Sequence, residues 1–140
     1  MESVINSNTV QANSRVTTSL VSIVDDDDSV REAINSLLRS VGLRADVFGS
    51  AEEFLTSDAV KDTACLILDV RMPGMSGLEL QARLAGTDYK IPIIFITAHA
   101  SDREARVRAL RAGALDFLYK PFTEEVLLKH VYAALRAGGG

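Results

Sequence analysis

Residues Leu66–Gly77 read LILDVRMPGMSG, an apolar run that ends in a carboxylate and passes into a loop containing proline and glycine. The run from Ala64 to Leu68 is too short for a core helix and has no polar alternation. It therefore predicts a strand buried on both faces, as in a parallel sheet. Asp69 then lies at the carboxyl end of that strand, the edge at which open α/β sheets bind their ligands. Taken alone, an Asp in this position is most often a turn residue, so its role depends on the rest of the chain.

The bulk composition is that of a globular protein with one domain. The chain has 140 residues, of which 47% are hydrophobic and 24% charged, and its formal net charge of −4 argues against direct binding to nucleic acid. No apolar run approaches the roughly 18 residues of a membrane helix, and the N-terminus lacks the pattern of a signal peptide. The single cysteine, Cys65, fits a buried core position. These features predict a cytoplasmic protein with no membrane partner.

The chain divides into one long periodic region with a short extension at each end. Residues 1–18 are polar and aperiodic, and we expect them to form a flexible N-terminal extension. Residues 19–137 hold the periodic segments and form the predicted domain. Residues 138–140 are three glycines, which are typical of a linker stub or tail.

Short apolar segments alternate five times with amphipathic segments inside the predicted domain. The amphipathic segments have apolar residues at helical spacing, so each predicted strand is followed by a predicted helix. The expected strands are residues 20–24, 43–48, 64–68, 91–97 and 114–119.

Local signals mark the ends and the inward faces of the predicted helices. Capping-box sequences occur at Ser50–Glu53, Ser76–Glu79 and Ser101–Glu104, where a helix begins at the serine. Thr123 caps the last helix, which follows the fifth strand. We expect the first and last helices to turn these residues toward the core: Val30, Ile34, Leu37, Leu38, Val41, Val126, Leu127, Val131 and Leu135.

The alternation predicts an α/β fold in three layers, α/β/α, with a parallel sheet covered on both faces. Five strands suit the doubly wound, flavodoxin-like order 2-1-3-4-5, whose switch point lies between strands 1 and 3. That order brings Asp25 and Asp26, at the end of the first strand, beside Asp69. Thr97 and Lys120, at the ends of the fourth and fifth strands, lie on the same edge.

These five side chains fit phosphoryl transfer. Two carboxylates about 4 Å apart repel each other by about 1 kcal/mol in water and by several times more in a desolvated cleft. A cation relieves this repulsion, and hard oxygen ligands that leave room for water and phosphate suit Mg²⁺. Lys120 adds a positive charge and Thr97 a hydroxyl donor, which can stabilise a transferring phosphoryl group. A carboxylate can itself accept that group as an aspartyl phosphate.

Each residue also has a purely structural interpretation. Asp27 and Asp28 fit an N-cap cluster favoured by the helix dipole. Thr97 could be an ordinary strand-end hydroxyl, and Lys120 a solvated lysine before a proline turn. The functional interpretation is favoured because the three carboxylates, the hydroxyl and the lysine all fall at strand carboxyl ends.

Four short motifs carry a more specific signal. They are VDDD at Val24–Asp27, LDVRMPGMSG at Leu68–Gly77, ITA at Ile96–Ala98 and KPF at Lys120–Phe122. Together they resemble the receiver (CheY-like) domain of two-component response regulators, over residues 20–136. The Asp69 loop is most similar to receivers attached to LuxR-type helix-turn-helix transcription factors.

The resemblance implies a metal site and a phosphoacceptor. Asp69 would accept a phosphoryl group from a sensor histidine kinase. Asp25 and Asp26 would bind Mg²⁺ together with Asp69, and the backbone carbonyl of Arg71 would complete the protein ligands. Mn²⁺ can substitute for Mg²⁺ in such sites.

The resemblance also implies a switch. Thr97 and Lys120 would contact the phosphoryl oxygens, and Phe117 matches the aromatic switch position that works with Thr97. The Lys120–Pro121 peptide bond is cis in family members.

The implied function is phosphorelay signal transduction by a phosphoprotein that controls an output, taken to be transcription. We expect no enzyme activity besides self-catalysed phosphorylation and dephosphorylation. Phosphorylation would pair two copies through a surface made by the helix at 101–112 and the fifth strand. DNA would be contacted only through an output domain absent from this chain, which makes the chain a stand-alone receiver or a fragment of a longer regulator.

Two other classes of protein stay open. Asp25–Ser29 loosely fits the signature of haloacid-dehalogenase-like phosphatases, in which Asp25 would be the nucleophile and Asp27 the acid/base of a Mg²⁺-dependent phosphohydrolase. That class offers no role for Asp69. The other is a degenerate interaction module that never takes phosphate, against which the complete set of Asp69, Thr97 and Lys120 argues.

Overall fold

A computed structural model describes residues 19–99 and 101–139. The predicted extension at 1–18 lies outside the described residues. The predicted linker at 138–140 stays a prediction, although the last helix runs through Gly139. Within the described part of the chain, no helix is long and apolar enough to cross a membrane.

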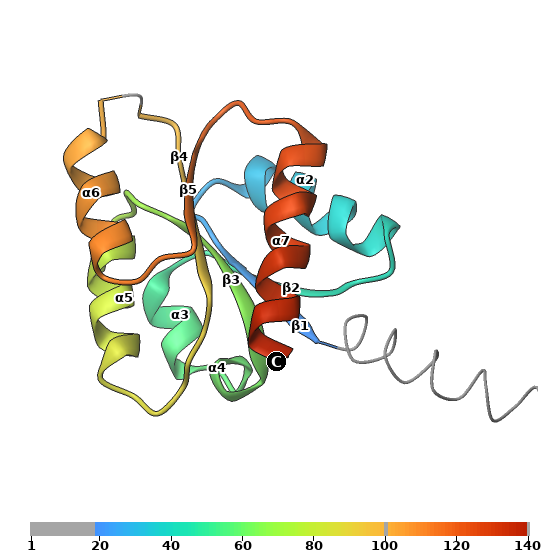
Figure 1. Ribbon diagram of the computed structural model, residues 1–140, viewed down its shortest axis with the longest axis horizontal. Helices are drawn as coiled ribbons and strands as arrows, with labels where there is room; N and C mark the ends of the chain where they lie inside the picture. The colour runs from blue at the N-terminus through green and yellow to red at the C-terminus, as the bar shows by residue number, and fades with distance from the viewer. Residues whose placement is uncertain (1–18, 100, 140) are drawn as a thin grey trace, which may run out of the picture.

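One parallel sheet of five strands forms the middle layer (Figure 1). The strand order is β2-β1-β3-β4-β5, which confirms the predicted doubly wound, flavodoxin-like α/β/α fold. β1, β4 and nearly all of β3 are buried along their length, as their apolar runs predict, whereas the edge strand β2 buries only Ala45 and Phe48. The strands are β1 (Leu20–Val24), β2 (Arg44–Phe48), β3 (Thr63–Asp69), β4 (Ile93–Thr97) and β5 (Asp116–Tyr119).

Helices cover both faces of the sheet. In Figure 1, α2 and α7 lie on one side of the strands, and α3, α5 and α6 on the other. A single extra turn, α4, packs with α3 and was not predicted, because four residues carry no periodic signal. The helices are α2 (Asp28–Ser40), α3 (Ala51–Thr56), α4 (Ala59–Asp62), α5 (Gly77–Ala85), α6 (Arg103–Arg111) and α7 (Glu124–Gly139).

The core consists of two apolar layers, one on each face of the sheet. The first joins alternate residues of the strands to Leu38 of α2 and Val131 of α7. The second joins the intervening strand residues to Phe54 of α3, Leu80 of α5 and Ala109 of α6. Burying each large aliphatic side chain contributes about 1.5–3 kcal/mol, so these layers hold the strand ends in register.

Two expected core positions are wrong. Val41 is 38% exposed because it is the C-cap residue of α2 and lies beyond the inward stripe, just before Gly42 takes a φ of 84°. Val126 is 39% exposed because the buried stripe of α7 runs through Leu127 and Val131, which leaves its neighbour on the solvent side.

The strand register brings the predicted site residues to one edge of the sheet. Asp69 ends β3, and Asp25 follows its neighbour β1. The backbone amide of Lys120, just past β5, donates to the carbonyl oxygen of Thr97 at the end of β4 over 2.7 Å. The Lys120–Pro121 peptide bond is cis, as the family resemblance implies.

Candidate functional site

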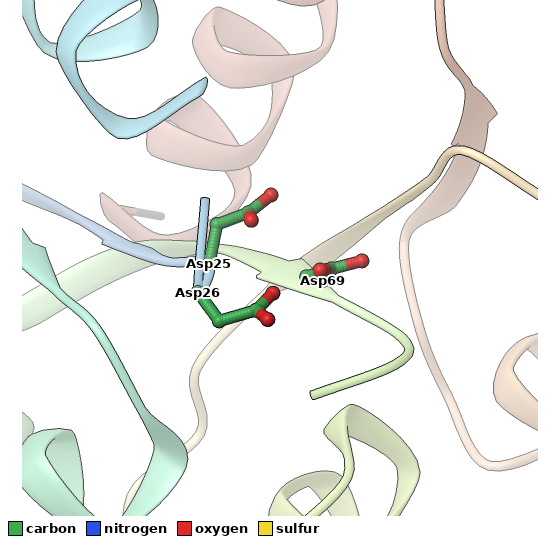
Figure 2. Close-up of side chains that lie close together, drawn as sticks. All are labelled: Asp25, Asp26 and Asp69. Atoms are coloured by element: carbon green, nitrogen blue, oxygen red, sulfur yellow. The ribbon is translucent and has the colours of Figure 1, made fainter. Parts of the chain in front are cut away.

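Three carboxylates meet at the carboxyl edge of the sheet (Figure 2). Asp25, Asp26 and Asp69 each offer an oxygen, and these oxygens lie within 4.8 Å of one another. Asp25 is fully buried and Asp69 nearly so, whereas Asp26 is exposed at the rim. Clustered carboxylate oxygens with one open side are the donor set that Mg²⁺ prefers, so these residues fit the cation that the sequence predicts.

The buried Asp25 carboxylate has partners on both oxygens. Its Oδ1 accepts a hydrogen bond from the backbone amide of Asp27 at 2.9 Å. Its Oδ2 accepts from Nζ of Lys120 at 3.0 Å, which forms a salt bridge between a fully buried carboxylate and a largely buried lysine. Arg31 donates to the backbone carbonyl of the same residue at 2.7 Å. Asp25 is therefore a fixed anchor that holds Lys120 at the site.

Asp69 holds a proton more readily than an ordinary aspartate. Burial and the negative charge of Asp25 raise the pKa of Asp69 to about 7, while Lys120 acts in the opposite direction. Without a cation, Asp69 is therefore partly protonated near pH 7, which reduces the repulsion among the three carboxylates. A bound divalent cation favours the charged form, which is the nucleophilic form.

The loop after Asp69 is fixed from two sides. The amide of Gly77 donates to the Val70 carbonyl at 2.9 Å, and a Cβ on Gly77 would lie 2.2 Å from the backbone oxygen of Asp69, so glycine alone permits this approach. Ser76 makes the predicted capping box at the start of α5. Glu52 of α3 accepts the amide of Met75 at 3.0 Å. Sequence analysis missed Glu52, because a contact across 23 residues leaves no local pattern.

A cavity of about 240 Å³ opens over the cluster and can admit a phosphoryl group with a hydrated cation. Arg71 and Lys120 reach its wall, and so does His99 of the β4–α6 loop. The lining residues are Asp25, Asp26, Asp27, Asp69, Arg71, Ala98, His99 and Lys120.

Thr97 is placed differently from the other site residues. Its side chain is fully buried and, among the described residues, it does not line this cavity. Its Oγ1 donates to Oδ2 of Asp102 at 2.8 Å and accepts from the amide of His99 at 3.1 Å. The structure thus brings Asp25, Asp69 and Lys120 together but turns the Thr97 hydroxyl toward α6.

The predicted capping box at Ser101–Glu104 is wrong. Asp102, not Ser101, is the N-cap residue of α6, and among the described residues its side chain makes no capping hydrogen bond. The reason is that its carboxylate is already engaged by Thr97 and by the guanidinium of Arg71. The predicted box at Ser50–Glu53 forms only in part: Ser50 caps Glu53, but Glu53 accepts from the amide of Gly49 instead.

Phe117 of β5 lies in the core beside the strand that carries Thr97. It is 4% exposed and packs on Phe95 of β4 and on Tyr119, with ring centroids 5.9 and 5.5 Å apart. The aromatic side chain is thus already inside in this arrangement. Any coupling to Thr97 runs through this packing and not through entry of an exposed ring.

Comparisons with known proteins agree on one family. The family model described as the response regulator receiver domain matches residues 21–132. The response regulator protein TmoT of Ectopseudomonas mendocina is 52% identical over 118 residues, which cover 84% of this chain and 53% of that protein. Nodulation protein W of Bradyrhizobium diazoefficiens is 51% identical over 118 residues, with 84% and 52% covered. The chain spans about half the length of the curated relatives it matches.

Solved structures give the same result. The response regulator StyR superposes with a TM-score of 0.79 at 47% identity, covering 85% of this chain and 60% of that one. The FixJ-N crystal structure superposes with a TM-score of 0.75 at 38% identity, covering 84% and 93%.

Proposed function

The chain belongs to the response regulator receiver family, and we propose that Asp69 is the residue that accepts the phosphoryl group. The chain is a receiver domain of the kind found in two-component response regulators. The observation that carries the proposal is the position of Asp69 inside the carboxylate cluster, at a cavity that Lys120 also lines.

Asp69 is better placed than its neighbours to act as the nucleophile. Each oxygen of Asp25 accepts one hydrogen bond, from the Asp27 amide or from Lys120, which makes it a poorer nucleophile but leaves a lone pair for a metal ion. The side chain of Asp27 accepts the amides of Ser29 and Val30 as the N-cap of α2 and so performs a structural role. These contacts argue against the phosphohydrolase in which Asp25 attacks and Asp27 transfers protons.

The proposed reaction is an in-line transfer. A carboxylate oxygen of Asp69 attacks phosphorus, and the new P–O bond forms as the P–N bond to the phosphohistidine of a sensor kinase breaks, while the leaving imidazole takes a proton. With a small donor such as acetyl phosphate the leaving group is acetate, and hydrolysis of the acyl phosphate reverses the modification. Lys120 is 3.0 Å from Asp25 and brings its charge to the phosphoryl oxygens.

Asp25, Asp26, Asp69 and the backbone carbonyl of Arg71 would hold Mg²⁺, or Mn²⁺ in its place. When bound, the cation supplies the positive charge that lets a carboxylate and a phosphate approach each other.

We further propose that phosphorylation is read out through Thr97 and Phe117. The modified Asp69 adds charge and acceptor oxygens, toward which the hydroxyl of Thr97 would turn. Phe117 packs against β4 and would follow. The surface proposed to pair two phosphorylated copies is the one that α6 and β5 form, where Val107 of α6 is 44% exposed and Leu115, just before β5, is 41% exposed.

The proposed partner is a sensor histidine kinase, and the proposed location of this protein is the cytoplasm. Contact with DNA is proposed only through an output domain, if one accompanies this receiver. These proposals are supported by the relative named transcriptional regulatory protein FixJ, which is 42% identical over 115 residues.

Labelling with acetyl phosphate and Mg²⁺ tests the assignment of Asp69. We expect an acid-labile phosphoryl group, detected as a mass increase, on the wild type and on the control Asp46→Asn, whose carboxylate is exposed on the edge strand β2. Asp69→Asn should take none, and Asp26→Ala should be labelled far more slowly. Stoichiometric labelling of Asp69→Asn would contradict the proposal.

A further inference from the structure

A buried carboxylate outside the acidic cavity accepts the hydrogen bond of the Thr97 hydroxyl. Asp102 is 3% exposed. Its Oδ2 accepts from Thr97 Oγ1 at 2.8 Å and from Arg71 Nε at 3.1 Å, and Nη2 of Arg71 forms an ion pair with its Oδ1. Three residues from three successive segments, at the ends of β3 and β4 and at the start of α6, thus form one network.

The network occupies the hydroxyl proton that Thr97 would need to bind a phosphoryl oxygen. A threonine hydroxyl has a single proton to donate. Here that proton is directed to Asp102, while the oxygen accepts the amide of His99 at 3.1 Å. Thr97 cannot donate to a phosphoryl oxygen on Asp69 until its bond to Asp102 breaks.

Arg71 connects this network to the phosphoacceptor. It stands two residues after Asp69, and it lines both the acidic cavity and the groove between α5 and α6 that contains Asp102. A phosphoryl group in the cavity brings negative charge that competes with Asp102 for the guanidinium. Weakening the ion pair loosens the Asp102 carboxylate, and with it the acceptor that holds Thr97.

We infer that Asp102 is a positioning residue that holds the Thr97 hydroxyl away from the Asp69 cavity, with Arg71 as its counter-charge. The inference rests on the proposed phosphorylation of Asp69. Asp102 would thus restrain the receiver. In the wild type, the Thr97 hydroxyl would point toward the Asp69 cavity in only a fraction of the molecules. Removal of the Asp102 carboxylate would increase that fraction.

Helix capping does not account for Asp102. It occupies the N-cap position of α6, yet its side chain makes no capping hydrogen bond to the described residues of that helix. Asp58 offers a matched control, because it is the N-cap residue of α4 and also lacks a capping hydrogen bond among the described residues. Asp58 lines a different cavity, together with residues of α4 and α5.

The restraint is tested by comparing the apparent Kd for beryllofluoride, in the presence of Mg²⁺, between the wild type and variants of Asp102. The beryllium stands for phosphorus and the fluorides for the phosphoryl oxygens. Because the apparent Kd is the intrinsic Kd divided by the competent fraction, we expect Asp102→Ala to bind about fivefold to tenfold more tightly than the wild type. Asp102→Asn keeps an acceptor and should bind about twofold to fivefold more tightly. Asp58→Ala should bind like the wild type.

A double variant separates this role from a general structural one. If Asp102 acts through the Thr97 hydroxyl, Asp102→Ala should no longer change the Kd in a Thr97→Ala background. Equal tightening in both backgrounds would overturn the inference, because a structural effect does not depend on that hydroxyl. Titration calorimetry gives the Kd, and circular dichroism verifies that each variant is folded.

The remaining outcomes decide between this inference and the proposed function. If the wild type binds beryllofluoride and Asp102→Ala binds equally or more weakly, the restraint is refuted and Asp69 stays the acceptor. If Asp102→Ala does not fold, the isosteric Asp102→Asn decides, and an unchanged Kd refutes the restraint. If the wild type neither binds beryllofluoride nor takes phosphate from acetyl phosphate, both ideas fail.

Discussion

Asp69→Asn should make the metal-free protein more stable at pH 8, although it removes the proposed phosphoacceptor. The physical reason is that the Asp69 charge is largely buried and also lies beside the carboxylates of Asp25 and Asp26. An asparagine has the same shape and no charge, so it relieves the repulsion without leaving a void.

The magnitude follows from the pKa of Asp69, which is raised from 3.8 to about 7. In full, that rise corresponds to about 4 kcal/mol between the charged and neutral forms. The carboxylate faces solvent on its cavity side, which screens the interaction, so we expect about 2 kcal/mol.

The pH dependence has a definite sign. Between about pH 4 and pH 7 the folded protein keeps a proton on Asp69 that the unfolded chain has lost, so the stability of the wild type falls as pH rises through this window. The advantage of Asp69→Asn should therefore grow from about pH 4 and level off above pH 7.

Urea unfolding in a chelator at pH 5 and pH 8 measures the effect, with the exposed Asp46→Asn as control. Saturating Mg²⁺ should make the wild type more stable than Asp69→Asn at pH 8, because the variant lacks one of the carboxylates that bind the cation. A cation at 100 times its Kd adds about 2.7 kcal/mol to the free energy of unfolding. If Asp69→Asn is no more stable than the wild type at pH 8 without metal, the carboxylates do not repel as argued.

Three further results are expected. Mg²⁺ should raise the Tm of the wild type by several degrees and that of Asp26→Ala much less, as differential scanning fluorimetry can test; equal rises would remove Asp26 from the metal site. Gly77→Ala should destabilise the fold by about 2–4 kcal/mol in urea unfolding, since its Cβ would lie 2.2 Å from the Asp69 backbone oxygen, whereas Gly86→Ala, with its nearest contact at 3.5 Å, should be near neutral. Beryllofluoride should drive dimerisation of the wild type but not of Thr97→Ala in sedimentation; equal dimerisation of both would exclude a switch through Thr97.

The fold could be predicted from the sequence because its strands and helices carry separate periodic signals. β1, β3 and β4 are apolar runs, and doubly wound topology leaves few ways to connect five such strands. Topology then places Asp25 beside Asp69 without any knowledge of side-chain packing. This is why the acidic cluster was predictable although Asp25 and Asp69 are 44 positions apart in the sequence.

The direction of single side chains could not be predicted in the same way. Ser76–Glu79 and Ser101–Glu104 have the same capping pattern, but only the first forms the box. The difference lies in tertiary neighbours: Asp102 meets Arg71, which is 31 residues away in the sequence, and a charged partner outweighs a local amide. The hydroxyl of Thr97 donates to this same Asp102 carboxylate, so its direction was not predictable either.

The last helix spans the distance between the acidic site and the opposite end of the sheet. α7 begins four residues after Lys120 and runs along the sheet to its opposite end (Figure 1). Sixteen residues of helix span about 24 Å. This is about three Debye lengths at physiological salt, so solvent ions largely screen exposed groups at the far end of α7 from a charge added at Asp69. If Asp69 is phosphorylated as proposed, an effect at that end would therefore be carried by movement of the packed apolar side chains beneath α7 rather than by the charge itself.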